Sequence, residues 1–508
     1  MEATGLRESI ELTAGSSNTI YPDPEQRIAR ALISEAEDQI NILNNEIIRV
    51  QRLLDSLEDR RTQEVARLNK LRIVIAPHKT LPPELLSQIF VDCVGGNEVR
   101  IPPNKSTAML WRLGLTCSRW RKISFSESRL WDKFFICGLP PYSKTSEITH
   151  YILSQIGNFP INFRIGEYPS QDKTFVLDLF SRYSNRIRGL SFWVANSISK
   201  HLYTASYPSN NLESLTMTVF DKIETSQYTP IISALSAHGH LQRLKLMGSL
   251  IHGWNHVKFD KIWVDSMSSF WAHLRSLTIG DGAYISHAAL ATILQHCTRL
   301  VYCDAVLVEV NDSYQMPSSS RTMEHLRRFA IDTRCSCATL GSLLDFLICP
   351  ELKVLDFRTS RTSDNLWPEV NLLNFISRSP GIQVLQFKQF PISDYGFRWL
   401  ICGLPALVTF DVKTLTPIPE TALDTIRREN LVPHLEAMDV WVASSRGISE
   451  LLESRWPALP GTQGLSNIVI RISAQHYHVE KDQFEALTSH LIKTGRRVQL
   501  VVLGDRIW

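Results

Sequence analysis

Apolar and polar residues follow three different patterns along the chain. Between residues 24 and 72 the spacing of the apolar residues alternates between four and three, which places them at Ala29, Ile33, Ala36, Ile40, Leu43, Ile47, Val50, Leu54 and Leu57. This mean period of ~3.5 residues is typical of a coiled-coil helix. The pattern predicts such a helix over 24–75, after a disordered polar leader over 1–23.

Ile or Leu occupies the a position of each full heptad, at Ile33, Ile40, Ile47 and Leu54. This choice mildly favours a parallel dimer, so we expect a homodimer through residues 29–57. No Asn in the seam fixes its register, and the seam breaks at Arg61 and Glu64 before it resumes at Leu68. The alternative is a long helix that packs against its own chain.

The second pattern is a pair of amphipathic segments between residues 78 and 136. A helix is predicted to begin at Pro82 and Pro83, because prolines in a first turn lose no intrahelical hydrogen bond. Its apolar face contains Leu81, Leu85, Leu86, Ile89, Phe90, Cys93 and Val94. Gly95 and Gly96 end this helix, and a second amphipathic segment begins near residue 106.

This segment resembles the F-box family. The family pattern reads Leu-Pro-x-Glu-Leu-Leu-x-x-Ile-Phe, later Cys-x-x-Trp-Arg, and then Leu-Trp. The three blocks occur here in the same order, at residues 81–90, 117–121 and 130–131. The loop over 95–107 is longer than in compact F-boxes and is similar to that of the F-box-like proteins abundant in fungi.

The resemblance implies docking on the Skp adaptor of cullin–RING ubiquitin ligases. By motif correspondence, the residues that contact the adaptor would be Leu81, Pro82, Leu85, Ile89 and Phe90. The residues that pack the core of the module would be Cys117, Trp120, Leu130 and Trp131. So small a module exposes more apolar surface than it buries, which agrees with an interaction site. The alternative is that the same side chains pack only against residues 137–200.

The third pattern is a strand signature, hydrophobic-x-x-hydrophobic-x-hydrophobic, that recurs along the rest of the chain. Its copies begin at Ile187, Leu212, Leu241, Leu274, Leu300, Leu326, Leu352, Ile382, Leu407 and Leu435. They are about 25–33 residues apart, near the ~20–29-residue period of leucine-rich repeats, and helical segments lie between them. The irregular spacing resembles the degenerate repeats often paired with F-boxes.

Together these patterns predict an α/β fold, a leucine-rich-repeat solenoid preceded by a small all-α F-box module and a coiled-coil helix. The F-box module is expected over 78–136. The repeat array is expected over 137–508, with a terminal cap of strand, helix and strand from residue 468. The alternative for the array is a conventional doubly wound α/β domain.

Side chains between the core positions of the repeats are expected to project from the concave face in two columns. The first column reads Thr216, Lys245, Thr278, Asp304, Ala330, Asp356, Gln386, Asp411 and Asp439. The second reads Thr218, Met247, Gly280, Val306, Asp332, Arg358, Lys388, Lys413 and Trp441. The candidate residues for substrate binding are Asp332, Asp356, Arg358, Lys388, Asp411, Lys413 and Trp441. Alternatively, the two columns neutralise each other as a solvated face.

Composition excludes several other classes of protein. The 508 residues carry 54 Lys and Arg against 51 Asp and Glu, and this balance argues against a nucleic-acid partner held by phosphate contacts. No apolar run reaches the ~18 residues that span a bilayer. The nine cysteines have no zinc or redox spacing, which indicates reduced thiols in the cytoplasm or nucleus.

Common catalytic signatures are missing from the sequence, which contains no phosphate-binding loop, dinucleotide fingerprint, zinc-protease motif or nucleophile elbow. We therefore expect no catalytic residue, no metal and no cofactor. The leading hypothesis is the substrate receptor of a Skp–cullin–F-box ubiquitin ligase, with an unknown protein substrate on the repeats. The alternative is a ligase-independent scaffolding protein that dimerises through its coiled coil and binds a partner through the repeats.

Overall fold

The computed structural model describes the chain in segments separated by short gaps. These are residues 20–75, 77–96, 98–101, 108–136, 142–166, 178–179, 181–194, 211–219, 232–233, 240–248, 255–256, 261–309, 314–359, 368–390, 393–414, 417–454, 465–493 and 497–503. Most of the predicted leader over 1–23 lies outside them. The chain divides into two compact units, Met1–Ile89 and Phe90–Trp508.

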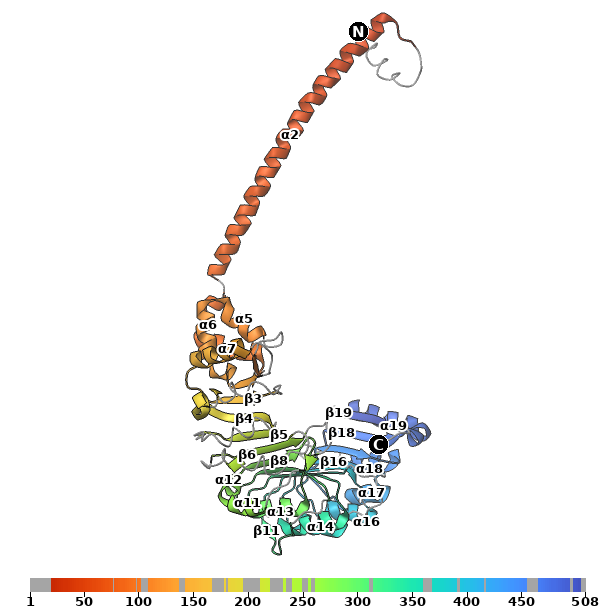
Figure 1. The fold of residues 1–508 in the computed structure, drawn as a ribbon. Coiled ribbons are helices and arrows are strands. Elements are labelled where there is room, and N and C mark those ends of the chain that lie inside the picture. Colours follow the sequence, from red (N-terminus) through yellow and green to blue (C-terminus); the bar gives the residue numbers. More distant parts are fainter. Residues whose placement is uncertain are drawn as a thin grey trace. The chain divides into compact units, whose positions relative to one another are not determined.

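The first unit is dominated by one long helix, α2 (Asp23–Val74), of 52 residues (Figure 1). Pro22 precedes it, and Asp23 and Glu25 in the first turn complement the positive end of the helix dipole. None of its residues is buried. The long helix is therefore confirmed, and its apolar seam is open to a partner.

The predicted amphipathic pair between residues 78 and 136 consists of three main helices. They are α4 (Pro83–Val94), which follows the short α3 (Pro77–Thr80), then α5 (Ala108–Thr116) and α6 (Ser118–Ser126), before the 3-10 turn η2 (Ser128–Leu130). The second predicted segment is split because Cys117 has an extended backbone, with φ −159° and ψ 169°.

The second unit contains a parallel sheet of 15 strands whose order in space follows their order in sequence. Its strands are β1 (Val99–Ile101), β2 (Lys133–Ile136), β3 (Ile161–Ile165), β4 (Ile187–Val194), β5 (Ser214–Val219), β6 (Arg243–Gly248), β8 (Ser276–Gly280), β10 (Tyr302–Leu307), β12 (Arg328–Thr333), β14 (Val354–Thr359), β15 (Val384–Phe390), β16 (Thr409–Thr414), β17 (Ala437–Trp441), β18 (Asn467–Ser473) and β19 (Arg497–Leu503). Two short strand pairs accompany it, β7 (Asn255–His256) with β9 (Ala283–Tyr284) and β11 (Arg321–Thr322) with β13 (Leu347–Ile348).

Each of the ten predicted strand signatures forms one strand of this sheet, from β4 to β17. The sequence-ordered strands contain no switch point, which excludes the doubly wound alternative. The strand, helix and strand predicted near the end of the sequence are also present, as β18, α19 (Ala474–Lys493) and β19. The solenoid of leucine-rich-repeat type is therefore confirmed.

The expectation that the module over 78–136 is all-α is wrong, because the sheet begins inside it. Val99 in β1 pairs with Phe134 in β2, and Phe134 pairs in turn with Phe163 in β3. Val99 and Phe134 are buried, so the module supplies two strands to the same core as the repeats. Three residues of β1 are too few for a periodic pattern to reveal.

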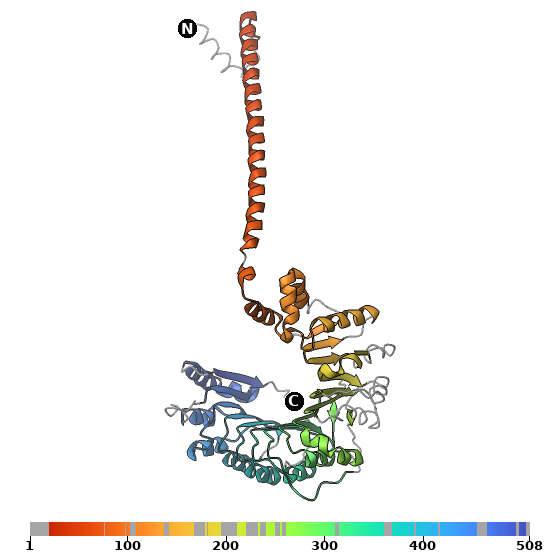
Figure 2. The same ribbon diagram turned by 90° about the vertical axis from the view of Figure 1, so that its left-hand side faces the viewer.

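Helices cover the outer side of the curved sheet within the second unit (Figures 1 and 2). Their bounds are α7 (Tyr142–Gln155), α11 (Lys261–Ser266), α12 (Ser268–His273), α13 (His287–His296), α14 (Cys337–Phe346), α15 (Glu369–Ser377), α16 (Asp394–Cys402), α17 (Glu420–Arg428) and α18 (Ser445–Ser454), with a 3-10 turn η3 (Ser184–Arg186) before β4. The alternate strand residues that face the helices are buried, as in the row Ile331, Phe357 and Phe387. Their polar neighbours are left on the inner face.

No helix in the described part of the chain is long and apolar enough to cross a membrane.

Candidate functional site

The helix α4 has two apolar faces, and only one of them is buried. Leu86 and Phe90, four residues apart, are each 1% exposed. Leu85 and Ile89, also four residues apart, are 53% and 43% exposed. Residues four apart lie on the same side of a helix, so Leu85 and Ile89 form one exposed apolar ridge. Pro82 before the helix is also exposed, and Leu81 is half-buried.

Phe90 differs from the other predicted adaptor contacts because it lies in the interior. Its ring centroid is 4.9 Å from that of Trp120, which is half-buried. The resemblance to the F-box placed Phe90 among the docking residues by motif correspondence. In this structure Phe90 packs in the interior of the module. The exposed ridge consists instead of Leu85 and Ile89, the residues that directly precede the buried Leu86 and Phe90.

Trp131 is the centre of the predicted module core. It is 2% exposed, and its ring lies 4.9 Å from Phe125 in a stacked arrangement. Its Nε1 donates a hydrogen bond of 2.6 Å to the Ser124 carbonyl oxygen, which satisfies the buried indole. Leu130 beside it is 3% exposed. These two residues are buried.

Cys117 does not lie in that core. It is exposed, and its Sγ accepts a hydrogen bond of 3.4 Å from the Trp120 backbone nitrogen at the first turn of α6. Its role is therefore that of an N-cap, which the spacing Cys-x-x-Trp also permits because N-caps bond two or three residues onward.

The first predicted column of the concave face is a continuous ladder of paired residues. The registers join Thr216 to Lys245, Thr278, Asp304, Ala330, Asp356, Gln386, Asp411 and Asp439 on successive strands. In the second column, Asp332, Arg358, Lys388 and Lys413 are likewise paired in order. The repeat pattern alone therefore placed these side chains on neighbouring strands.

Many charges on these columns neutralise one another. Arg358 bonds both carboxylate oxygens of Asp356, which is only 1% exposed. Lys413 lies 3.3 Å from Asp411 and 3.5 Å from Asp439. For these residues the structure favours the alternative of a mutually neutralised face.

Arg471 is a charged residue that the two columns omitted. It lies on β18 beside Trp441, and its guanidinium donates hydrogen bonds of 2.6 and 2.8 Å to Asp439. The hydrogen bonds to Asp439 raise the pKa of Arg471. The signal was available, because Arg471 alternates with Ile470 and Ile472 in the cap strand, and extending the columns by one strand finds it.

Three predicted substrate-face residues keep unused bonding capacity. Lys388 makes no ion pair with any residue that the structure describes. The Trp441 Nε1 and the Asp332 Oδ1 are buried and have no hydrogen-bond partner among the described residues. Burial raises the pKa of Asp332, against the opposing effect of Arg334. The same cause raises the pKa of Asp304 and Asp411.

Asp332→Asn is expected to stabilise the second unit at neutral pH. A carboxyl whose pKa is raised on folding destabilises the native state once pH exceeds its unfolded value of ~3.9. The neutral amide removes that penalty, so the denaturant midpoint should rise at pH 7 and change little at pH 3, where Asp332 is protonated. Asp482→Asn on the exposed surface of α19 is the control. A lower midpoint at pH 7 would mean that attraction to Arg334 and Arg358 outweighs burial.

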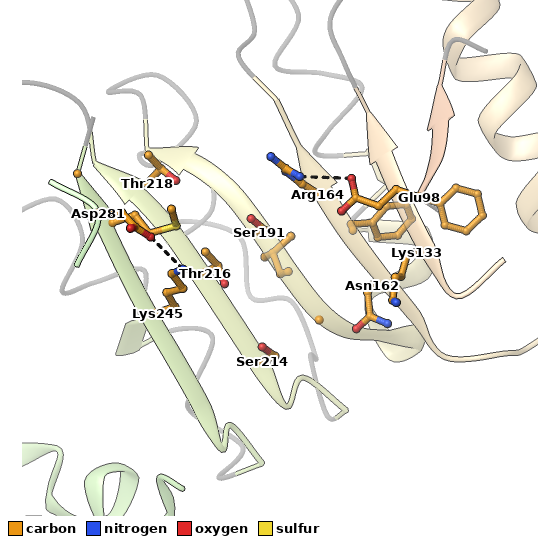
Figure 3. Close-up of a pocket in the computed structure, with 16 residues that line it drawn as sticks. Glu98, Lys133, Asn162, Arg164, Ser191, Ser214, Thr216, Thr218, Lys245 and Asp281 are labelled. Carbon is orange, nitrogen blue, oxygen red and sulfur yellow. Dashed lines mark hydrogen bonds and ion pairs between the residues drawn. The ribbon is translucent and has the colours of Figure 1, made fainter. Parts of the chain in front are cut away.

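A hollow of about 700 Å³ lies on the inner face of strands β2 to β6 (Figure 3). The charged pairs of the two columns described above lie farther along the sheet, on β14 to β17. The lining of the hollow includes the small side chains of Ser191, Ser214 and Thr216. Two ion pairs border it, Arg164 with Glu98 at 3.3 Å and Lys245 with Asp281 at 3.1 Å. The sequence patterns did not indicate this hollow, because small residues carry no motif.

In the described residues, no group of three or more His, Cys, Asp or Glu side chains is arranged to hold a metal ion.

Comparison with known proteins identifies one part of the chain. The F-box-like family matches residues 78–137. No curated protein is significantly similar in sequence. The solved structure of a TLR13–ssRNA13 complex is similar over 58% of this chain and 40% of that chain, with 13% identity and a TM-score of 0.33. The repeat assignment rests on the strand order and not on this distant likeness. The chain thus contains an F-box-like domain followed by a solenoid of leucine-rich-repeat type.

Proposed function

We propose that the protein is the substrate-recognition subunit of a Skp–cullin–F-box ubiquitin ligase. The observation that carries this proposal is the exposed ridge of Leu85 and Ile89 inside the segment that the F-box-like family matches. Covering such an exposed apolar ridge with another apolar surface removes it from water and lowers the free energy of the complex. The occupant that the F-box resemblance implies is the Skp adaptor, with Leu81, Pro82 and the ridge as contacts.

The repeats would hold a protein substrate on their inner face. Proteins with an F-box and leucine-rich repeats are typically non-catalytic adaptors. Other subunits would transfer ubiquitin, so this chain would need neither a cofactor nor a catalytic residue. The cytoplasm or the nucleus is the compartment where such a ligase would act.

The test is co-purification of the full chain with the Skp adaptor and a cullin. The ligase proposal expects both in the same complex. The rival proposal, a scaffold that dimerises through α2 and binds a partner on the repeats, expects the partner without either ligase subunit. If the folded protein were purified from cells that contain both subunits and neither subunit came with it, the result would favour the scaffold.

Lys388→Glu combined with Trp441→Ala is expected to reduce substrate capture several-fold. Both residues retain bonding capacity that a substrate can use. Reversal of Arg358 would instead place a like charge beside the buried Asp356 and leave it only the longer contact to Arg328, so that variant would test folding. Quantitative mass spectrometry of proteins captured by the full chain measures the effect, with adaptor recovery as the internal control. If the variant captured all proteins other than the adaptor as well as the native chain does, Lys388 and Trp441 would not be substrate contacts.

A further inference from the structure

The floor of the hollow on β2 to β6 consists mainly of small side chains. Ser191 pairs with Thr216 in the first column, and Gly189 pairs with Ser214 in the row beside it. At the other end of the same column stand Asp356, Asp411 and Asp439, whose longer side chains are bonded to cations. The inner face therefore carries longer, mutually bonded side chains toward its C-terminal end and short ones at the hollow.

Gly189 has a specific reason to lack a side chain. A Cβ at this position would lie 2.2 Å from the Oδ1 of Asn162 on the neighbouring strand. The Asn162 amide is held in place because its Nδ2 donates a hydrogen bond of 3.0 Å to the Asp132 carbonyl oxygen. The floor thus presents an oriented amide together with the hydroxyls of Ser191, Ser214 and Thr216 (Figure 3).

Cations border this floor on both sides. Lys133 and Arg164 lie on β2 and β3, and Lys245 lies on β6. Arg164 and Lys245 are paired with Glu98 and Asp281, but both pairs are about half exposed to solvent. Exposed pairs contribute about 0–1 kcal/mol, so a competing carboxylate can replace their anions.

Lys133 makes no ion pair within the described ranges. The first column also changes sign along the sheet. The strand registers extend it from Thr216 back through Ser191 to Arg164, Phe135 and Arg100, and it becomes acidic from Asp304 onward. The hollow lies in the basic part of the column.

We propose that this hollow binds an extended, acidic segment of a protein substrate, an inference that rests on the proposed substrate-receptor function. Carboxylates of the segment contact the cations at the two borders. Hydroxyl and amide groups both donate and accept hydrogen bonds, so the floor matches the alternating N–H and C=O groups of a peptide backbone.

The strand spacing predicts the pattern of acidic residues in that segment. Arg164 and Lys245 are three strand steps apart and Lys133 and Lys245 are four, or about 14 and 19 Å at ~4.8 Å per step. An extended chain advances ~3.3 Å per residue. The segment that spans the floor therefore has two acidic residues about four to six positions apart, with small polar residues between them.

The test is selection of short random-sequence peptides on the purified full chain, followed by affinity measurement with a fluorescent copy of the best peptide. We expect enrichment of Asp and Glu at this spacing, and affinity that falls with added salt. Lys133→Glu and, independently, the charge-neutral Thr216→Phe that fills the floor should each weaken binding about tenfold or more. Lys261→Glu, the same charge reversal on the outer helix α11, should leave it unchanged.

The proposal would be overturned if the selected peptides contained no acidic residues, or if neither hollow variant changed their affinity. It would also be overturned if no peptide bound the folded protein. Adaptor capture measured on the same preparation separates this outcome from failure of the ligase function. A chain that captures the adaptor and binds no acidic peptide disproves the hollow as the site and leaves the receptor proposal standing.

Discussion

Replacing Leu85 and Ile89 together by aspartate is expected to abolish capture of the Skp adaptor by the full chain. Both side chains are about half exposed, so the double variant places its charges in water in the free protein and in an apolar interface in the complex. Complete burial of one such side chain contributes about 1.5–3 kcal/mol. Because about half of each side chain remains to be buried, loss of both contacts amounts to about 1.5–3 kcal/mol, or about ten- to a hundredfold in affinity. The cost of burying two carboxylates adds to this loss.

The matched control for this variant is Leu115→Asp on α5. Leu115 is 75% exposed in the same module and is outside the F-box motif positions that imply adaptor contact. It should retain adaptor capture and the thermal stability of the native chain. A folded Leu85→Asp, Ile89→Asp protein that still captured the adaptor would contradict the docking assignment and favour the scaffold.

Phe90→Ala would be a misleading substitute for this experiment. Phe90 is 1% exposed and contacts Trp120, and removal of a buried phenylalanine ring typically costs about 3–5 kcal/mol of stability. Adaptor capture by this variant would be lost through damage to the module, whether or not Phe90 touches the adaptor. A thermal melt distinguishes the two cases, because only the Phe90 variant should melt early.

The repeat array could be predicted because its sequence shows two periods, the two-residue alternation within each strand and the spacing between repeats. Alternation of core and inner-face residues fixes each strand, and the repeat spacing fixes which residues are neighbours. Thr216 and Asp439 are therefore correctly placed in one ladder although seven strands lie between their own. The short strand β1 was missed, since Val99, Arg100 and Ile101 show no periodicity that distinguishes them from a loop.

The candidate site was less predictable than the fold. Sequence patterns show which side chains project from the inner face, but not which of them are already bonded. Asp356 was a candidate for substrate contact, and its burial under Arg358 depends on side-chain positions across strands. The hollow at Ser191 and Gly189 was missed for the opposite reason, because a surface made of small residues has no chemical signature in one sequence.

The open seam of α2 leads to the second large prediction, that the full chain is a dimer. Ile40, Ile47 and Leu54 are 54–55% exposed, although each would be buried in a parallel coiled coil. Ile40→Lys together with Ile47→Lys should convert the dimer to a monomer, because four apolar side chains, two from each helix, are replaced by facing cations. Sedimentation velocity at micromolar concentration measures the change. Asn41→Lys with Asn45→Lys, which adds the same charge outside the seam, should leave the dimer intact.

The interruption at Arg61 and Glu64 gives this prediction a second, opposite test. In a parallel dimer these residues occupy the a and d positions, so each faces its own copy in the partner helix. Replacing both by leucine should therefore tighten the dimer and lower its dissociation constant by about tenfold or more. A chain that begins at residue 76 should be monomeric. If the native chain and this shortened chain were both monomers, α2 would have some other partner and the dimer proposal would fail.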